Sequence, residues 1–305
     1  MSKVFEALRK LEKDSNGISA DFGGEVQAIF QESAPSHQTP SILENGNGTV
    51  HTEAIASGFR ALPVRVSVDS PLMPFMPLEQ SHQRAGEQYR IIRTKIVQHP
   101  RSPKVMVVSS VDSGDGKTTS SINVAAALAL KSEVNVLLVD ADLRRGKICE
   151  LLGIPEAPGL TDVLMGANSP EEAIVRAEQF PNLHILSAGS RQANPTELLD
   201  SPRWRALVQQ FRKRFNYVIL DTPPIGYLAD YDLLQAASDG VLVVARLDYT
   251  NKTRCLKALK TIPEERLIGV ILNCVEDWFL AKGSSYYSYS PSPKEEKTSA
   301  GLGLR

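Results

Sequence analysis

The chain has 305 residues, of which 42% are hydrophobic, so it is long enough to bury one sizeable core and leave segments outside it. Its formal net charge of −1 provides no general electrostatic attraction to nucleic acid, and we expect no nucleic-acid partner. The three cysteines lack metal-ligand spacing and do not suit a disulfide framework, and no run predicts a signal peptide or a membrane span, so we expect a cytoplasmic protein.

The first 84 residues differ in composition from the rest of the chain. Residues 3–13, KVFEALRKLEK, place apolar side chains on one helical face, which predicts a short amphipathic helix within residues 1–14. The residues leave open whether this helix packs on its own domain or docks on a partner or a membrane surface. Residues 15–84 are rich in Ser, Gly, Gln, Asn and Pro, which predicts a low-complexity linker, although residues 61–68 could add an edge strand.

Ordered structure is predicted to resume at residue 85 with a helix, AGEQYRIIRTKI. Glu87 and Arg90 are three residues apart and therefore neighbours on this helix, whereas Arg93 is rotated partly off their face. Taken alone, these side chains are interpreted as solvated charges on an exposed helix face.

The stretch at residues 105–119, VMVVSSVDSGDGKTT, has the pattern of a phosphate-binding loop. A short apolar run, a loop of Ser, Asp and Gly, and an Ala-rich segment from Ser120 predict a strand, a tight loop and a helix. Gly114 and Gly116 allow the loop to turn its backbone N–H groups toward a phosphate at the positive end of the helix. Lys117 would add a positive charge at the β- and γ-phosphates, and Thr118 a hydroxyl ligand for Mg²⁺.

This loop departs from G-x-x-x-x-G-K-[ST] at its first position, which is Val111. The strand and helix on either side still favour a phosphate site over a Gly-rich turn with an incidental lysine. Deviant P-loop ATPases of the MinD/ParA kind carry a second lysine in K-G-G-x-G-K-T, and that position is Asp112 here. The lysine that reaches across a partition-ATPase dimer is therefore missing.

Carboxylates follow two of the predicted strands. The strand at residues 135–139 is followed by Asp140 and Asp142, which point the same way, toward the crevice where parallel sheets bind ligands. We interpret them as a pair for Mg²⁺ binding and proton handling. A second strand, residues 217–220, is followed by Asp221, a further carboxylate on the Mg²⁺ side. Three other carboxylates are interpreted as helix caps and surface charges: Asp230, Asp232 and Asp239.

The remaining segments continue an alternation of strands and helices. Strands are predicted at residues 183–186, 241–245 and 267–272, and helices at residues 201–214 and 252–261. This alternation predicts an α/β fold with a doubly wound, mostly parallel sheet. Because its loop at residues 105–119 resembles a deviant, MinD-like Walker A loop, we expect the fold to be of the P-loop NTPase type. After the last strand, a polar side chain is either a turn residue or a partner of a purine edge: Asn273.

Residues 278–305 cannot build a core, and we expect them to form a flexible tail. Three tyrosines crowd into four of its positions: Tyr286, Tyr287 and Tyr289. The residues alone leave a compositional accident and a functional cluster equally open.

Taken together, residues 85–275 and the tail resemble the bacterial tyrosine kinase family, the CpsD/CapB-type autokinases of exopolysaccharide and capsule synthesis. The resemblance rests on an ordered set of motifs, which are EQYRIIRTKI, SSVDSGDGKTT, VLLVDADLRR, PGLTDVL, NPTELL, YVILDTPP, GVILN and the terminal tyrosines. It implies a P-loop kinase domain at residues 85–277 that uses ATP and Mg²⁺.

The resemblance also implies roles for individual residues. Those implied to bind the nucleotide are Ser113, Gly114, Asp115, Gly116, Lys117, Thr118, Thr119 and Asn273, the last beside adenine. Those implied to be catalytic are Lys117, Asp140, Asp142 and Asp221, and the implied Mg²⁺ ligands are Thr118, Asp140 and Asp221. The E-x-x-R-x-x-R element that assembles family members into rings matches Glu87, Arg90 and Arg93, which replaces their interpretation as solvated charges. The implied phosphate acceptors are Tyr286, Tyr287 and Tyr289.

The function implied is that of an ATP-dependent protein-tyrosine autokinase that regulates polysaccharide synthesis and export. The resemblance further implies a homo-oligomeric ring, a cognate phosphatase, and recruitment to the inner face of the plasma membrane by an adaptor of the polysaccharide co-polymerase type. Two alternatives are a MinD/ParA-like ATPase switch without kinase activity and an adaptor that works without nucleotide. Asp112, in place of the signature lysine, and the tyrosine cluster argue against the switch.

Overall fold

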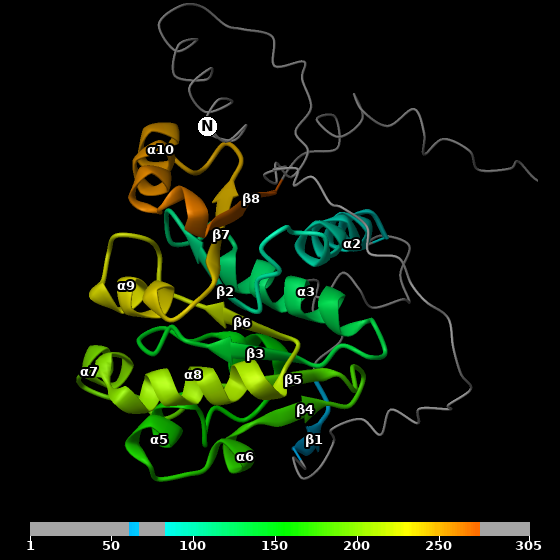
Figure 1. The fold of residues 1–305 in the computed structure, drawn as a ribbon, viewed down its shortest axis with the longest axis vertical. Coiled ribbons are helices and arrows are strands. Elements are labelled where there is room, and N and C mark those ends of the chain that lie inside the picture. Colours follow the sequence, from blue (N-terminus) through cyan, green and yellow to red (C-terminus); the bar gives the residue numbers. More distant parts are fainter. Residues whose placement is uncertain (1–60, 67–82, 275–305) are drawn as a thin grey trace, which may run out of the picture.

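The computed structural model describes residues 61–66 and 83–274 and is built on one central sheet (Figure 1). The strands are β1 Leu62–Val64, β2 Val105–Ser110, β3 Val136–Asp140, β4 Val175–Ala177, β5 Leu183–Leu186, β6 Tyr217–Asp221, β7 Gly240–Arg246 and β8 Leu267–Asn273. Their order across the sheet is β1-β4-β5-β3-β6-β2-β7-β8, and every neighbouring pair is parallel except β4 and β5. The predicted doubly wound, mostly parallel sheet is confirmed.

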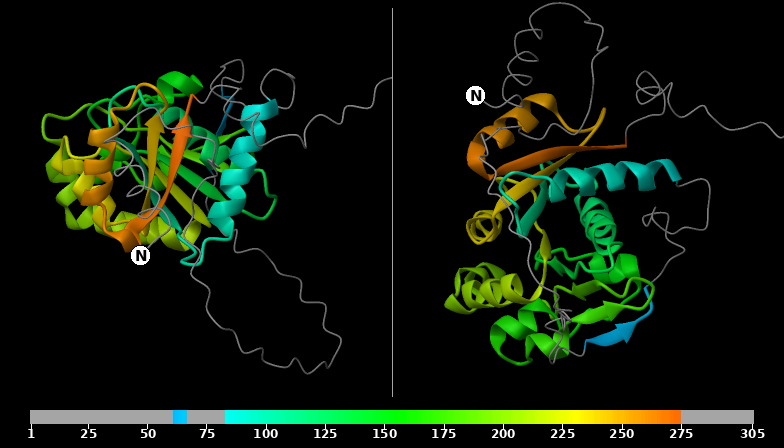
Figure 2. Two further views of the ribbon diagram at one scale, coloured as in Figure 1. Left: turned by 90° about the horizontal axis from the view of Figure 1, so that it is seen from above. Right: turned by 45° about the vertical axis from the view of Figure 1, so that its right-hand side comes forward.

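Helices cover both faces of the sheet (Figure 2). One face is covered by α2 Gln83–Val97, α3 Lys117–Ala129 and α4 Ile148–Leu152. The other is covered by α5 Leu160–Met165, α6 Pro170–Ala173, α7 Pro195–Asp200, α8 Pro202–Arg214, α9 Ala229–Ala236 and α10 Lys252–Thr261, and a short 3₁₀ helix, η3 Glu264–Arg266, precedes β8. No helix in the described ranges is long and apolar enough to cross a membrane.

Two hydrophobic cores explain why the central strands read as unbroken apolar runs. All six residues of β2 are buried. Val105 and Val107 pack into the core under α8 and α9, whereas Met106 and Val108 pack into the core under α2 and α3. Successive side chains of a strand point to opposite faces, so a strand covered on both sides is mostly apolar, as at residues 105–108, and its two buried serines are hydrogen-bonded.

The predicted edge strand near residues 61–68 is confirmed as β1, which pairs with β4 in the register Leu62↔Val175. The sheet therefore extends into the segment whose composition predicts a linker. The strand β4 was not predicted, because three residues with a central Arg176 show no recognisable period. The predicted N-terminal helix and the tyrosine tail lie outside the described residues, and the domain boundaries stay a prediction.

Local signals place the helices that were predicted best. The Ser201 hydroxyl accepts a hydrogen bond from the Trp204 backbone N–H, and Pro202 occupies the first turn. A serine cap followed by proline is a common signal for the start of a helix, and α8 begins at this signal. Asn251 caps α10 in the same way, by accepting from the Arg254 backbone N–H. These two helices match their predicted ranges almost residue for residue.

Candidate active site

The P-loop joins β2 to α3 and relies on two glycines in the left-handed region. Gly114 has φ +94° and Gly116 has φ +91°, a conformation that residues with a side chain rarely adopt. A Cβ added to Gly116 would lie 2.0 Å from the Nδ2 atom of Asn273. Gly116 is therefore required both by its backbone conformation and by the close approach of a neighbouring strand end.

We expect Gly116→Ala to lower ATP affinity by more than about tenfold, because the loop must shift both to relieve strain and to clear the Asn273 amide. Calorimetric titration with a non-hydrolysable ATP analogue measures this effect. Gly226→Ala is the matched control, since Gly226 has φ +77° but open space around its Cβ position. Equal losses of affinity in the two variants would contradict the steric part of the argument.

Lys117 lies between two of the predicted catalytic carboxylates. Its Nζ is 3.3 Å from Oδ2 of Asp142 and 3.4 Å from Oδ2 of Asp221, and it lies 3.3 Å from the Thr118 hydroxyl. Burial by itself lowers the pKa of the Lys117 ammonium, but the charges of Asp221, Asp142 and Asp140 outweigh burial and raise that pKa. Lys117 is thus a firmly charged ammonium at the base of the P-loop.

Asp221 is placed by the end of β6 and held by α3. Its register partner on the neighbouring strand is Asp140, so the two carboxylates lie side by side at the same edge of the sheet. The Ser121 hydroxyl donates to Oδ1 of Asp221 at 3.0 Å. Burial raises the pKa of Asp221, although Lys117 and the hydroxyls of Thr118 and Ser121 oppose that shift.

Asp140 is fully buried and only half satisfied. Its Oδ2 accepts the Ile148 backbone N–H at 3.0 Å, whereas its Oδ1 has no hydrogen-bond partner among the residues that the structure describes. Burial, reinforced by the charge of Asp221, raises the pKa of Asp140 to about 7. A buried carboxylate oxygen without a donor fits a cation that would satisfy it.

The donor set at this edge is suited to Mg²⁺. Hard oxygen ligands are available from Thr118, Asp140 and Asp221, which lie at the start of α3 and at two adjacent strand ends. Within residues 61–66 and 83–274, no group of three or more His, Cys, Asp or Glu side chains is arranged to hold a metal by itself. Mg²⁺ does not need such a cage, because phosphate oxygens and waters commonly complete its coordination.

The side chain of the predicted loop residue Asp115 is used to support the loop itself. Its carboxylate is fully buried and accepts the Asp112 backbone N–H at 2.8 Å and the Thr250 hydroxyl at 2.7 Å. The Tyr249 hydroxyl donates to the Ser113 carbonyl at 3.4 Å. Thr250 and Tyr249 follow β7, and nothing in their local sequence marks them as supports of a loop 135 residues away.

Asn273 also supports the P-loop, since its Nδ2 donates to the Asp115 carbonyl at 3.0 Å. Its expected position beside adenine stays a prediction. Thr119 lies in the first turn of α3, where its carbonyl accepts from the Asn123 amide at 2.9 Å. The structure therefore gathers the whole predicted nucleotide set around one loop, with Asn273 arriving from the end of β8.

The interpretation of Asp230 as a helix cap or surface charge is wrong, because its side chain is buried. Its side chain is 1% exposed and pairs with the Arg144 guanidinium at 2.8 Å. The Thr196 hydroxyl donates to the same carboxylate at 2.5 Å. Burial by itself raises the pKa of Asp230, but these hydrogen bonds outweigh it and lower that pKa. Asp230 thus ties the loop that carries Asp142 to α7 and α9.

Asp239 likewise forms structural hydrogen bonds and an ion pair within the fold. Its Oδ2 accepts the backbone N–H groups of Lys104 and Val105, at 2.8 and 2.9 Å, where the chain enters β2. Arg212 of α8 pairs with it at 2.7 Å. In sequence, an aspartate before a strand looks the same whether it faces water or the backbone of a neighbouring strand.

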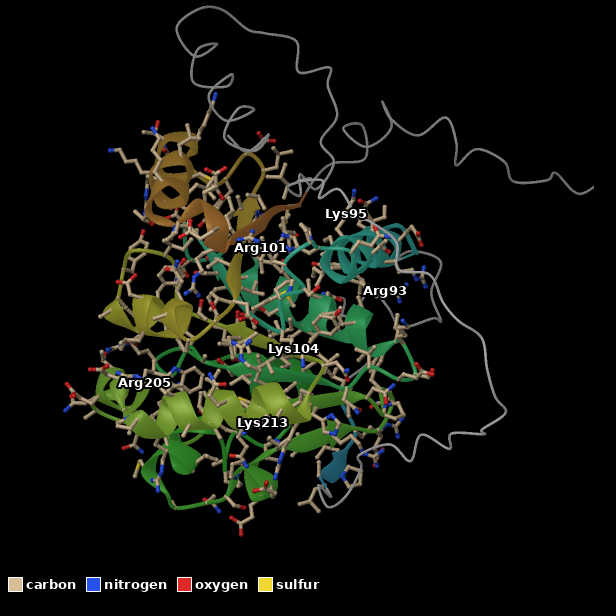
Figure 3. The ribbon with its side chains drawn as sticks, viewed as in Figure 1. Arg93, Lys95, Arg101, Lys104, Arg205 and Lys213 are labelled. Carbon is tan, nitrogen blue, oxygen red and sulfur yellow. The ribbon has the colours of Figure 1, made fainter. Side chains whose placement is uncertain are left out.

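The three residues predicted to form the ring interface, Glu87, Arg90 and Arg93, all lie on α2. Arg90 pairs with Glu87 at 2.9 Å, and both side chains are about half exposed. Arg93, labelled in Figure 3, donates to the Ala127 carbonyl of α3 at 3.5 Å, so its predicted rotation off the shared face is confirmed. The tyrosines at 286, 287 and 289 lie outside the described residues.

Comparison with known proteins gives consistent matches. A family model described as an AAA domain matches residues 103–266. Tyrosine-protein kinase YwqD of Bacillus subtilis (strain 168) is 35% identical over 208 residues, 67% of this chain and 86% of that protein. Tyrosine-protein kinase CpsD of Streptococcus pneumoniae serotype 4 is 32% identical over 208 residues, 66% of this chain and 91% of that protein. In tyrosine-protein kinase ptk of Acinetobacter johnsonii, 32% identical, the match spans only 28% of that protein.

Solved structures show the same likeness. The chimerical protein CapA2B2 is 27% identical with a TM-score of 0.61, covering 70% of this chain and 93% of that one. The kinase domain of Escherichia coli tyrosine kinase ETK is 27% identical with a TM-score of 0.59, covering 68% of this chain and 80% of that one. Since the family model spans more than half of the chain, and the match covers most of the length of YwqD and CpsD, the chain belongs to the bacterial tyrosine-protein kinase family.

Proposed function

We propose that this chain is an ATP- and Mg²⁺-dependent autokinase that phosphorylates its own Tyr286, Tyr287 and Tyr289. The observation that carries the proposal is the arrangement of Lys117 between Asp142 and Asp221 beneath the P-loop. This arrangement places a fixed positive charge and two carboxylates where a γ-phosphate would be transferred. The family of the chain supports tyrosine as the acceptor.

In this mechanism, the protein supplies position and charge. Backbone N–H groups of the P-loop and the Lys117 ammonium neutralise the negative charge that spreads over the phosphoryl oxygens. Thr118, Asp140 and Asp221 would hold Mg²⁺, which adds further charge neutralisation when bound. The tyrosine oxygen bonds to the γ-phosphorus as the bond to the bridging oxygen breaks and ADP leaves.

The phenol proton needs an acceptor, because the pKa of tyrosine is about 10. Asp142 is our candidate. Its side chain is 6% exposed and lies 3.3 Å from the Lys117 ammonium, so it is held in place at the site. Because Asp140 and Asp221 are the proposed Mg²⁺ ligands, Asp142 is the remaining carboxylate that can accept the proton.

We propose that the kinase domain spans residues 85–277 and that the chain assembles into a ring through Glu87, Arg90 and Arg93. In this arrangement, the tail of one subunit reaches the P-loop of the next. We further propose that a membrane adaptor of the polysaccharide co-polymerase type recruits the ring to the inner face of the plasma membrane, where it regulates exopolysaccharide or capsule synthesis. A cognate phosphatase would reverse the modification.

Mass spectrometry after incubation with Mg-ATP tests the autokinase. We expect phosphate on the three tail tyrosines of the wild type and none in Lys117→Met. A variant with all three tyrosines changed to Phe should gain no phosphate. When it is mixed with Lys117→Met, however, it should phosphorylate the tail of the Lys117 variant, because its own site is intact.

The contrary outcomes separate the alternatives. Saturable ATP binding without phosphate on any tyrosine, in the presence of the adaptor's cytoplasmic segment, would favour a nucleotide switch. Absence of ATP binding would favour an adaptor that works without nucleotide. Phosphate on the tail of Lys117→Met alone would contradict the catalytic assignment of Lys117.

A further inference from the structure

The P-loop of this chain carries two carboxylates, Asp112 and Asp115, although such a loop must hold an anionic phosphate. Asp115 is turned away, into hydrogen bonds with Thr250 and the loop backbone. Asp112 stands at the mouth of the loop, five residues before Lys117, and its side chain is 16% exposed. An uncompensated charge at Asp112 would oppose the binding of a nucleotide triphosphate.

The structure shows how this charge is compensated. The Arg254 guanidinium lies 2.5 Å from Oδ1 of Asp112, and the Tyr227 hydroxyl donates to the same oxygen at 3.0 Å. Arg254 also contacts the Tyr227 hydroxyl, and its guanidinium lies 5.8 Å from the centre of the Tyr227 ring. Two groups from separate parts of the chain, the Arg254 guanidinium and the Tyr227 hydroxyl, therefore converge on one oxygen of the Asp112 carboxylate.

The position of Arg254 is fixed by its helix. The Asn251 side chain accepts the Arg254 backbone N–H at 3.1 Å, which sets the first turn of α10. The Arg254 side chain is 52% exposed where it contacts Asp112. Holding an exposed arginine in one geometry costs side-chain entropy, so an accidental surface pair would not be expected to keep Arg254 on both Asp112 and Tyr227.

We propose that Arg254 is a positioning residue for nucleotide binding, because it neutralises Asp112 and so allows the loop to accept phosphate. This inference rests on the proposed function only in requiring that the loop binds nucleotide phosphates. Arg254 acts through Asp112 and is not placed on the nucleotide. The first turn of α10 thereby becomes part of the nucleotide site.

A double-mutant cycle tests this assignment. The full chain, its Arg254→Ala and Asp112→Asn variants and the double variant are titrated calorimetrically with a non-hydrolysable ATP analogue and with ADP, at fixed Mg²⁺. We expect Arg254→Ala to weaken binding of the ATP analogue about fivefold, and ADP binding less, since ADP carries less charge. Asp112→Asn and the double variant should both bind within about twofold of wild type, because the uncompensated charge is gone.

Salt and conservative substitution separate a charge effect from a loss of structure. The defect of Arg254→Ala should shrink when KCl is raised from about 0.05 M to about 0.5 M, because screening weakens the repulsion. Arg254→Lys should recover most of the affinity, whereas Arg254→Gln should behave like Arg254→Ala. Thermal unfolding of each variant shows whether the fold is kept.

A matched control is available on α8. Arg205, labelled in Figure 3, pairs with Asp200 at 3.2 Å on an exposed surface well separated from α10. Arg205→Ala should leave nucleotide affinity unchanged. The inference is overturned if Arg254→Ala binds like wild type, or if its loss persists in the Asp112→Asn background. Absence of nucleotide binding by the wild type would overturn the proposed site itself.

Discussion

Lys117→Met is expected to lower the rate of phosphate transfer by about 100- to 1,000-fold, because one fixed charge at the transferring phosphoryl group is lost. The side chain of Lys117 is only 14% exposed, so water cannot readily replace the missing ammonium. The initial rate of phosphotyrosine formation measures the effect. Lys213→Met is the matched control, since Lys213 is an exposed residue of α8.

The same substitution should also destabilise the folded protein in a pH-dependent way. Lys117 lies beside Asp142 and Asp221, and its charge opposes the rise in pKa that burial imposes on Asp221. Without Lys117, the pKa of Asp221 rises further, so the folded state binds more protons and loses stability as pH increases. We expect a loss of about 2–4 kcal/mol at pH 8 and a smaller one at pH 6.

Urea unfolding at both pH values, without nucleotide, measures this loss. An equal loss of stability at the two pH values would contradict the electrostatic explanation and point to packing instead. Retention of more than a tenth of the transfer rate would contradict the role of Lys117 at the phosphoryl group. The stability and the transfer rate are independent measurements, because urea unfolding is carried out without ATP.

The sequence predicted the loop and its carboxylates because local chemistry specifies them. A strand, two glycines and a lysine at a helix start define the P-loop wherever they occur, and each of Asp140 and Asp221 stands at a strand end. What local chemistry does not specify is which strands are neighbours. The pairing of Asp140 with Asp221 depends on β3 lying beside β6, which follows from crossovers that no local pattern reports.

Residues that support the site from a distance were missed for the same reason. Arg254 and Thr250 meet the P-loop across more than 130 residues of chain, and neither stands in a motif. Asp230 was misread because an aspartate in the first turn of a helix usually caps it, whether or not it is buried. Its carboxylate is buried in an ion pair with Arg144, which is 86 residues away in the sequence.

Asp140→Asn is expected to stabilise the nucleotide-free protein at pH 8 while removing most of its Mg²⁺-dependent activity. The pKa of Asp140 is raised from 3.8 to about 7, so the folded state holds a proton that the unfolded chain has released at neutral pH. The destabilisation therefore begins near pH 4, grows as pH rises, and is complete above pH 7. Three pKa units correspond to about 4 kcal/mol, the upper limit of the expected gain.

Urea unfolding of wild type and Asp140→Asn between pH 5 and pH 8 measures the difference, which should widen as pH rises. Asp239→Asn is the control of opposite sign. Burial favours protonation of Asp239, but the Val105 N–H, Arg212 and the Lys104 N–H outweigh it and lower its pKa, so this carboxylate stabilises the fold once ionised. Asp239→Asn should therefore lose stability, and its deficit should be present throughout this pH range.

The activity of Asp140→Asn should fall by about 100-fold, because a neutral amide is a poor ligand for Mg²⁺ and adds no negative charge to hold it. Raising Mg²⁺ should recover part of that loss, whereas it should not rescue Lys117→Met. A variant that is neither more stable at pH 8 nor dependent on added Mg²⁺ would contradict the assignment. The buried Oδ1 of Asp140, which has no hydrogen-bond partner among the described residues, would then need an explanation other than a bound cation. On the present assignment, burial of the Asp140 carboxylate destabilises the fold, and a cation bound beside it relieves that cost.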